Sequence, residues 1–196
     1  QHLLTTQSLE GRWFFRGAAL RQFQPLGRPG ATALALHALL KSGVPKDHLA
    51  IQRGFAALEH EEIDQTYDAS AVILALLARG EKADHIAIGG LVRQLLGSQH
   101  NGIWGYPSQP GDLSNTQYAA LALWSAERAG FAMGQSTWID LAEALPRYAD
   151  RRGGFVYTAG RGAKAPPSMT AAGLMCISVC RHTLTSVLER DTYLRS

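Results

Sequence analysis

The sequence contains only two cysteines, Cys176 and Cys180. Residues four apart lie on the same face of a helix, one turn from each other. A disulfide between them would close a very small loop and constrain little of the unfolded chain. We therefore predict that both cysteines are small core residues and that they form no disulfide.

Charge is sparse along the chain, and neither sign dominates. Lys and Arg number 19 against 16 Asp and Glu, which gives a formal net charge of +3. A protein that binds nucleic acid usually concentrates basic residues in a stripe or run, whereas the arginines here are spread along the sequence. We predict no nucleic-acid partner.

Long apolar runs and a signal peptide are also lacking. A membrane-spanning helix needs roughly 20 consecutive apolar residues, and no stretch of the sequence approaches that length, so we predict no membrane span. The first residue is Gln1 rather than Met, which leads us to expect a processed chain or a piece of a longer one.

Alanine and leucine dominate the apolar residues, which favours helices over strands. Four runs are apolar on nearly every side of a helix, and such helices must be buried all round. They are 31–40, 69–78, 118–126 and 170–180. Short buried strands of a βαβ fold are the rival interpretation, but Thr32 is the only β-branched residue of the first run.

Segments with one apolar face lie between these runs. Residues 47–60, 88–96 and 136–150 mix apolar and charged positions at helical spacing, which predicts amphipathic helices with one solvated face. We expect Asp47 and Asp84 to cap two of them, and Ser114 with Gln117 to form a capping box before the third apolar run. Left-handed glycines are expected after the first three apolar runs, at Gly43, Gly80 and Gly130.

The connecting loops contain a second repeated pattern. Gln7, Gly11 and Trp13 form one copy, Gln99, Gly102 and Trp104 form a shortened copy, and Gly154, Phe155 and Tyr157 repeat its aromatic end. Glycine allows a tight turn after an amphipathic helix. The aromatic side chain can then fill the seam between two hairpins, while glutamine bonds backbone groups at a helix end.

This pattern resembles the QW and prenyltransferase-type repeats of squalene–hopene cyclases and of protein prenyltransferase β subunits. The resemblance is clearest over 95–123. It implies an all-α fold, an α/α toroid or partial toroid of about four helical hairpins with buried inner and amphipathic outer helices. We expect a single domain, 1–196, with a partial repeat at 1–29 and hairpins at 30–60, 66–98, 113–150 and 168–193. These are fewer hairpins than a complete ring requires, so a protein partner or a second copy could complete it.

The resemblance also implies a cavity lined by the first residues of the inner helices. Its ligand would be an isoprenoid or another apolar small molecule, and Asp68 with Asp64 would be the candidate catalytic acids. The candidate ligand-binding residues at these helix ends and in the glycine-aromatic turn are Tyr67, Trp104, Tyr106, Gln117, Tyr118 and Thr170. Their structural interpretation is that Asp68 caps a helix and that the aromatic residues fill seams.

The catalytic motifs of the resembled families are absent from this sequence. There is no Asp-x-Asp-Asp acid motif, and the zinc-binding Asp, Cys and His of the prenyltransferases have no full counterpart. We predict no metal and no cofactor, and helical geometry directs His182 away from the two cysteines. Our first hypothesis is a non-catalytic binding or interaction module. The alternatives are a terpenoid cyclase-like enzyme that uses Asp68, and a carbohydrate-active α/α barrel that uses Asp64 and Asp68.

Overall fold

The computed structural model describes residues 2–14, 29–160 and 164–193, with side chains up to residue 185. The described residues form helices joined by turns, and no β-strand occurs among them. The all-α class predicted from the Ala- and Leu-rich runs is therefore confirmed. The chain divides into two compact units, residues 1–92 and residues 93–196.

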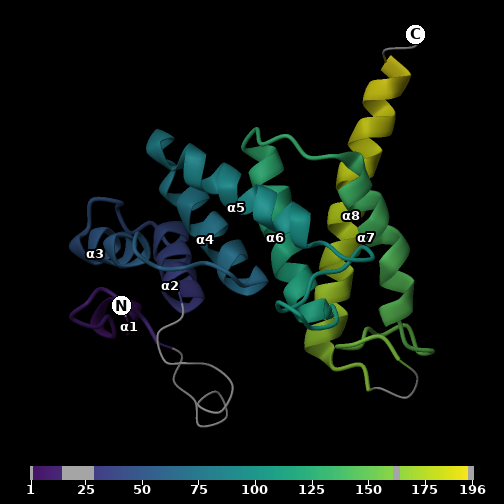
Figure 1. The fold of residues 1–196 in the computed structure, drawn as a ribbon, viewed down its shortest axis with the longest axis horizontal. Coiled ribbons are helices and arrows are strands. Elements are labelled where there is room, and N and C mark those ends of the chain that lie inside the picture. Colours follow the sequence, from purple (N-terminus) through teal and green to yellow (C-terminus); the bar gives the residue numbers. More distant parts are fainter. Residues whose placement is uncertain (1, 15–28, 161–163, 194–196) are drawn as a thin grey trace. The chain divides into compact units, whose positions relative to one another are not determined.

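Unit 1 is built around two inner helices that pack side by side, α2 (Pro29–Lys41) and α4 (Thr66–Arg79). The outer helix α3 (Leu49–Leu58) packs against α2 (Figure 1). The short helix α1 (His2–Thr5) precedes them, and the 3₁₀ helix η2 (Lys82–Asp84) leads into α5 (His85–Ser98). Along the chain, the largely buried helices α2 and α4 are each followed by a helix with an exposed side, α3 and α5.

The core of unit 1 lies between α2 and α4, whose alanines and leucines allow close approach. Every residue of α4 from Asp68 to Leu76 is buried, as its unbroken apolar run predicts. His37 extends from α2 to α4, where its Nδ1 lies 2.9 Å from the Leu74 carbonyl oxygen. His37 therefore links the two helices through a polar contact within unit 1.

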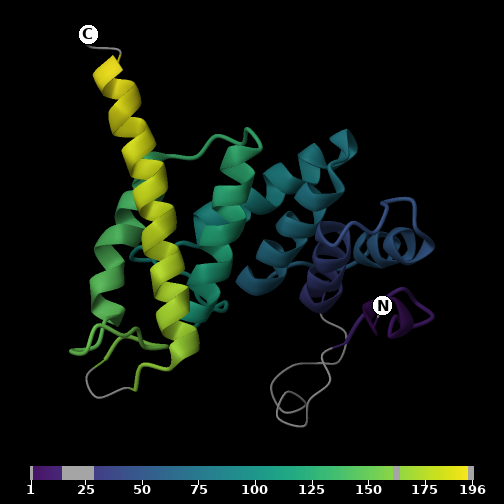
Figure 2. The same cartoon turned by 180° about the vertical axis from the view of Figure 1, so that it is seen from behind.

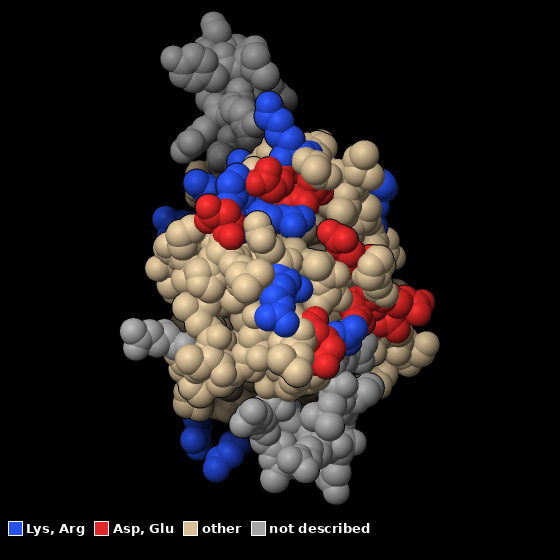
Figure 3. Space-filling view, turned by 90° about the vertical axis from the view of Figure 1, so that its left-hand side faces the viewer, with Lys and Arg blue, Asp and Glu red and all other residues tan. Residues whose placement is uncertain are grey.

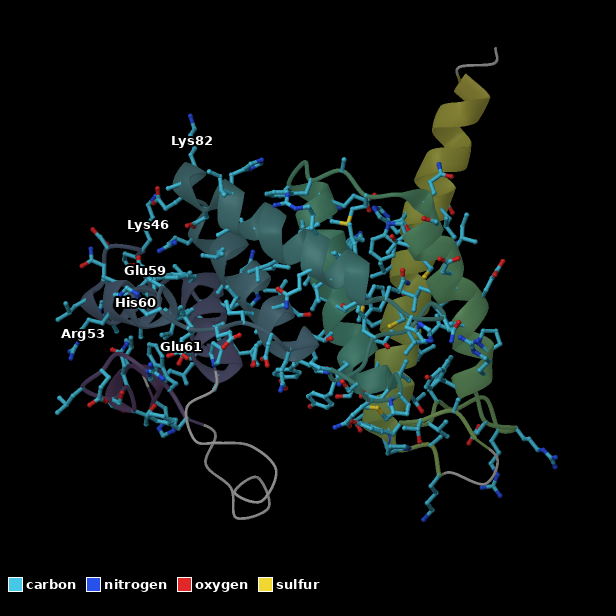
Figure 4. All side chains as sticks on the ribbon, viewed as in Figure 1. Lys46, Arg53, Glu59, His60, Glu61 and Lys82 are labelled. Atoms are coloured by element: carbon cyan, nitrogen blue, oxygen red, sulfur yellow. The ribbon has the colours of Figure 1, made fainter. Side chains whose placement is uncertain are left out.

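Several charged side chains lie at the surface of unit 1. Arg79 lies 3.8 Å from the centre of the Phe55 ring and donates a 2.8 Å hydrogen bond to Asp84. Figure 4 shows Arg53 and Lys82 extending away from the helices that carry them. On the face drawn in Figure 3, basic and acidic side chains are interspersed, so this face offers no large area of one sign.

Unit 2 contains the inner helices α6 (Leu113–Arg128) and α8 (Pro167–Tyr193), which pack together (Figure 2). The outer helix α7 (Gln135–Ala144) packs against α8 and continues into the 3₁₀ helix η3 (Leu145–Tyr148). Cys176 and Cys180 are buried and free, as predicted. Burial raises the pKa of Cys176 to about 12 and that of Cys180 to about 11, so both remain neutral thiols.

The predicted helix ends were correct for the glycines and wrong for two of the three polar caps. Gly43, Gly80 and Gly130 all have positive φ. The cap of α3 is His48 rather than Asp47, because the His48 ring accepts the amide of Ala50.

The capping box predicted at the start of α6 was also wrong. That helix is capped by Asp112, so Ser114 lies inside the helix and forms no capping box with Gln117. Asp84 directly precedes α5 and pairs with Arg79, and its capping of α5 stays a prediction.

The hairpin expected at 168–193 is one continuous helix, α8. No glycine or proline occurs in this segment after Gly173, so nothing there turns the chain. Among the helices of the described part of the chain, none has the length and apolar character needed to cross a membrane.

Candidate functional site

A glycine-aromatic turn precedes three of the four inner helices. In each turn a glycine with φ between +79° and +83° stands two residues before a buried aromatic residue. The three pairs are Gly11 with Trp13, Gly102 with Trp104, and Gly153 with Phe155. The third glycine is therefore Gly153, one residue before the position that the sequence pattern indicated.

The same threonine bond ties each turn to the inner helix that follows it. The aromatic residue donates its backbone N–H to a threonine hydroxyl over 3.1 Å in all three turns. The acceptors are Thr32, Thr116 and Thr170, each the fourth residue of its helix. Thr170, a predicted ligand residue, thus has a structural hydrogen bond.

The tryptophans of the first two turns also bond the helix that precedes them. The indole of Trp13 donates to the Leu3 carbonyl oxygen of α1 over 2.8 Å, and the indole of Trp104 donates to the Leu95 carbonyl oxygen of α5 over 2.7 Å. The short α1 thus accepts the indole bond of Trp13 as α5 accepts that of Trp104. Trp104 has no exposed surface and fills the seam.

Glutamine attaches the first two turns to the next outer helix. Gln7 donates to the Ala50 carbonyl oxygen of α3 over 2.8 Å, and Gln99 donates to the Thr137 carbonyl oxygen of α7 over 3.0 Å. Both bonds go to main-chain atoms, which agrees with the role predicted for these glutamines.

The candidate acid Asp68 lies at the start of α4 and is only 3% exposed. Its Oδ1 accepts the backbone N–H of Gly30 in α2 over 3.0 Å, and thereby satisfies one of the free donors at the start of that helix. Asp64 lies in the preceding loop and is exposed. The two carboxylates therefore occupy different environments.

The remaining predicted ligand residues are half-buried. Tyr67 lies beside Asp68, and its Cδ1 would be 3.3 Å from a Cβ placed on Gly30. Gln117 and Tyr118 are both on α6, while Tyr106 lies in the loop after Trp104. Tyr67 belongs to unit 1, whereas Tyr106, Gln117 and Tyr118 belong to unit 2.

A polar cluster at the start of α6, here called the α6 cap cluster, consists of Asp112, Asn115 and Tyr157. Asp112 accepts the backbone N–H and the side-chain amide of Asn115, both over 2.8 Å. The backbone carbonyl of Tyr157 accepts from Leu113 over 2.9 Å. Asp112 was not among the predicted cap residues, although aspartate is a preferred cap residue.

In the α6 cap cluster, the pKa of the Tyr157 phenol is raised. Partial burial raises the pKa of Tyr157 to about 12 from 10.0, and the negative charge of Asp112, nearby Tyr106 and a hydrogen bond to Asp112 act in the same direction. This neutral phenol donates a hydrogen bond and is a poor base. The carboxylates Asp68 and Asp112 both hold helix starts in place.

The raised pKa of Tyr157 predicts a loss of stability at alkaline pH. The folded state keeps a proton that the unfolded state releases near pH 10. This stabilisation is therefore complete below about pH 10 and is lost as the pH rises towards about 12. Urea unfolding followed by circular dichroism across this range should show a steeper decline for the wild type than for Tyr157→Phe. Equal slopes would contradict the assignment.

No group of three or more His, Cys, Asp or Glu side chains that could hold a metal ion occurs among the residues described here. No protein-family model and no curated protein matches the chain. The repeated turns and their bonds to neighbouring helices are therefore described from this structure alone.

Proposed function

We propose that this chain is a non-catalytic helical-repeat module that binds a partner helix through an exposed face of α8. The observation that carries the proposal is a difference between equivalent positions of the four inner helices. Counting from the first residue of each helix aligns the bonded threonines of α2, α6 and α8, and the same count can be applied to α4.

The eighth residue of an inner helix is buried in three helices and exposed in the fourth. Leu36, Ile73 and Ala120 have no exposed surface, whereas Leu174 of α8 is 55% exposed. The eleventh residue follows the same rule: Leu39, Leu76 and Leu123 are at most 7% exposed, whereas Ile177 is 42% exposed. Two adjacent large apolar residues thus lie open at positions where the repeat otherwise makes packing contacts.

A terpenoid cyclase-like enzyme that uses Asp68 is the rival proposal, and a carbohydrate-active barrel that uses Asp64 and Asp68 is a second one. The environment of Asp68 favours the non-catalytic function, because its carboxylate is buried and accepts a backbone hydrogen bond from α2. A proton donor for a substrate needs an accessible carboxyl group within hydrogen-bond reach of that substrate.

The structural role of Asp68 predicts the effect of its removal. Asp68→Ala leaves the buried N–H of Gly30 without this acceptor, so we expect the free energy of unfolding to fall by about 1–3 kcal/mol. Asp64→Ala, at an exposed loop position, should change it by less than about 0.5 kcal/mol. Urea unfolding of the two variants measures both values, and equal effects would argue against the structural role.

Incubation with isoprenoids tests the non-catalytic proposal directly. We expect the purified chain to leave squalene, farnesyl diphosphate and geranylgeranyl diphosphate unchanged. Product formation that Asp68→Asn abolishes would replace the proposal with the enzyme. Solvent extraction and mass spectrometry of the purified chain form the second arm: a stoichiometric isoprenoid or other lipid would indicate an apolar small-molecule ligand instead of a partner helix.

A further inference from the structure

The exposed side of α8 combines an apolar pair with a cation. Leu174, Ile177 and Arg181, here called the α8 face, are all exposed. Their spacing of three and four residues places them on one side of the helix. Arg181 follows Leu174 by seven residues, which corresponds to about 10 Å along the helix axis. The α8 face is therefore apolar at one end and basic at the other.

The cation at the basic end distinguishes α8 from the other inner helices. Counted from the first residue of the helix, the fifteenth position of α2 and of α4 is a left-handed glycine that follows the helix, Gly43 and Gly80. In α6 the same position is the acidic Glu127. The helix α8 continues past this position and carries Arg181 there. Among the four inner helices, only α8 thus has a positive charge at this position.

Two further basic side chains lie beside Trp124 of α6, close to the basic end of the α8 face. The ring of His182, which follows Arg181 in the sequence, lies 5.9 Å from the Trp124 ring, centre to centre. The Arg128 guanidinium lies over the same ring at 5.2 Å. Neither Arg128 nor Arg181 forms an ion pair with an acidic side chain of the described residues. This end of the face therefore carries positive charge that no described ion pair neutralises.

Unit 1 shows what kind of element covers the equivalent apolar position. Leu36 is the eighth residue of α2, as Leu174 is of α8, and it packs against Gly54 of the outer helix α3. Its Cδ2 lies only 2.7 Å from the place that a Cβ on Gly54 would take. The covering helix therefore presents a glycine, and the absent side chain makes room for the leucine.

The apolar face of α3 continues on both sides of this glycine. Ile51, Phe55 and Leu58 are at most 8% exposed. With Gly54 they follow the spacing i, i+3, i+4 and i+7, which defines one face of a helix. An amphipathic helix with a glycine between larger apolar residues is thus the form of cover that unit 1 places over the eighth residue of α2.

We propose that the partner of the α8 face is an amphipathic helix that carries an acidic residue. A glycine in its apolar face lies over Leu174, a larger apolar neighbour contacts Ile177, and a carboxylate about two helical turns from the glycine pairs with Arg181. Charge complementarity selects the acid, because a basic residue at that place would be repelled by Arg181 and Arg128. The inference rests on the proposed function and names the chemistry of its partner.

The two ends of the α8 face make different contributions to binding. Leu174 and Ile177 bury apolar area against any helix of suitable shape. The carboxylate pairs with an exposed arginine, and salt screens that attraction. The acidic residue therefore determines which helix is preferred, and the preference weakens as sodium chloride is added.

A pair of stapled helical peptides tests the proposal. Both peptides repeat the apolar face of α3, with isoleucine, glycine, phenylalanine and leucine at the spacing found there. One has glutamate seven residues to either side of the glycine, and the other has lysine at both places. Fluorescence anisotropy measures their affinity for the full chain. We expect the glutamate peptide to bind about five- to tenfold more tightly at low salt, and the two affinities to converge as sodium chloride is added.

Variants of the chain separate binding from selectivity. Leu174→Asp should weaken binding of the glutamate peptide by about tenfold or more. The matched control is Ile139→Asp, which should leave binding unchanged, because Ile139 of α7 is 41% exposed, close to Ile177, and lies outside the α8 face. Arg181→Glu should reverse the preference in favour of the lysine peptide, and circular dichroism checks that each variant is folded. A preference that Arg181→Glu leaves unchanged overturns the proposal.

The remaining outcomes distinguish this inference from the proposed function. Equal binding of both peptides, weakened by Leu174→Asp, overturns the acidic residue and retains a partner helix, whereas binding of neither peptide overturns both. Two other occupants have their own signatures. Self-association in sedimentation velocity that Leu174→Asp removes would assign the face to a second copy. Binding to phosphatidylserine vesicles that Leu174→Asp removes would assign it to a lipid surface, and either result overturns the proposal.

Discussion

Replacing Gly102 with alanine is expected to lower the free energy of unfolding by about 3 kcal/mol or more, a large fraction of the stability of a typical domain. Gly102 has a φ of +79°, a conformation that costs a residue with a Cβ about 1–2 kcal/mol. A Cβ there would also overlap the Asp140 carbonyl oxygen of α7 and lie 2.9 Å from the Ala144 Cβ. Because both neighbours belong to α7, relief of the clash requires movement of that helix.

Gly130→Ala is the matched control for the left-handed conformation alone. Gly130 has a φ of +97°, and a Cβ there would meet no atom within 4 Å. We expect it to cost about 1–2 kcal/mol, and urea unfolding followed by circular dichroism measures both variants. If Gly102→Ala costs no more than Gly130→Ala, the close approach of the turn to α7 is not a source of stability.

Removal of the Trp104 side chain is expected to have the second large effect, about 3–5 kcal/mol for Trp104→Ala. The ring has no exposed surface, and its indole N–H donates to the Leu95 carbonyl oxygen. Trp104→Phe keeps most of the ring volume but leaves that carbonyl without the indole donor, for an intermediate cost of about 1–3 kcal/mol.

Trp124→Ala provides the comparison for Trp104. Trp124 is half-buried on α6, with Arg128 over its ring at 5.2 Å and His182 at 5.9 Å, so its loss removes less buried area. The same unfolding measurement should rank Trp104→Ala, then Trp104→Phe, then Trp124→Ala. A larger loss for Trp124 than for Trp104→Ala would mean that the glycine-aromatic turn is not central to unit 2.

Much of the fold could be predicted from the sequence because the information is local. An apolar run such as 69–78 leaves no solvated side for a helix, and Gly43, Gly80 and Gly130 end helices in a conformation that glycine adopts readily. Helix caps were harder to predict because several neighbouring residues could cap. His48 caps α3 in place of Asp47, and Asp112 caps α6 in place of Ser114. Backbone geometry, which the residue types do not determine, decides which residue caps.

The candidate site depends on contacts between distant residues, which the sequence pattern does not contain. The position of Asp68 at a helix start was predictable, but its bond to Gly30 joins residues far apart in the chain. Leu174 and Ile177 likewise continue the apolar spacing of the other inner helices. Their exposure follows from what packs against α8, a property of the tertiary structure.

The two glycine-aromatic turns that contain a glutamine share contacts with carbonyl oxygens of the outer helices. Gln7 donates a hydrogen bond to the Ala50 carbonyl oxygen, and Gly11 lies against the Arg53 carbonyl oxygen. Gln99 and Gly102 make the same two contacts with the carbonyl oxygens of Thr137 and Asp140. Arg53 and Asp140, at equivalent positions, carry opposite charges.

Because the contacts that the two turns share end on carbonyl oxygens, the side chains on the surface of an outer helix can change without removing these contacts. Mutation can therefore give each hairpin a new outer surface while the joints persist. Hairpins could also be duplicated or exchanged between chains of this design as interchangeable parts.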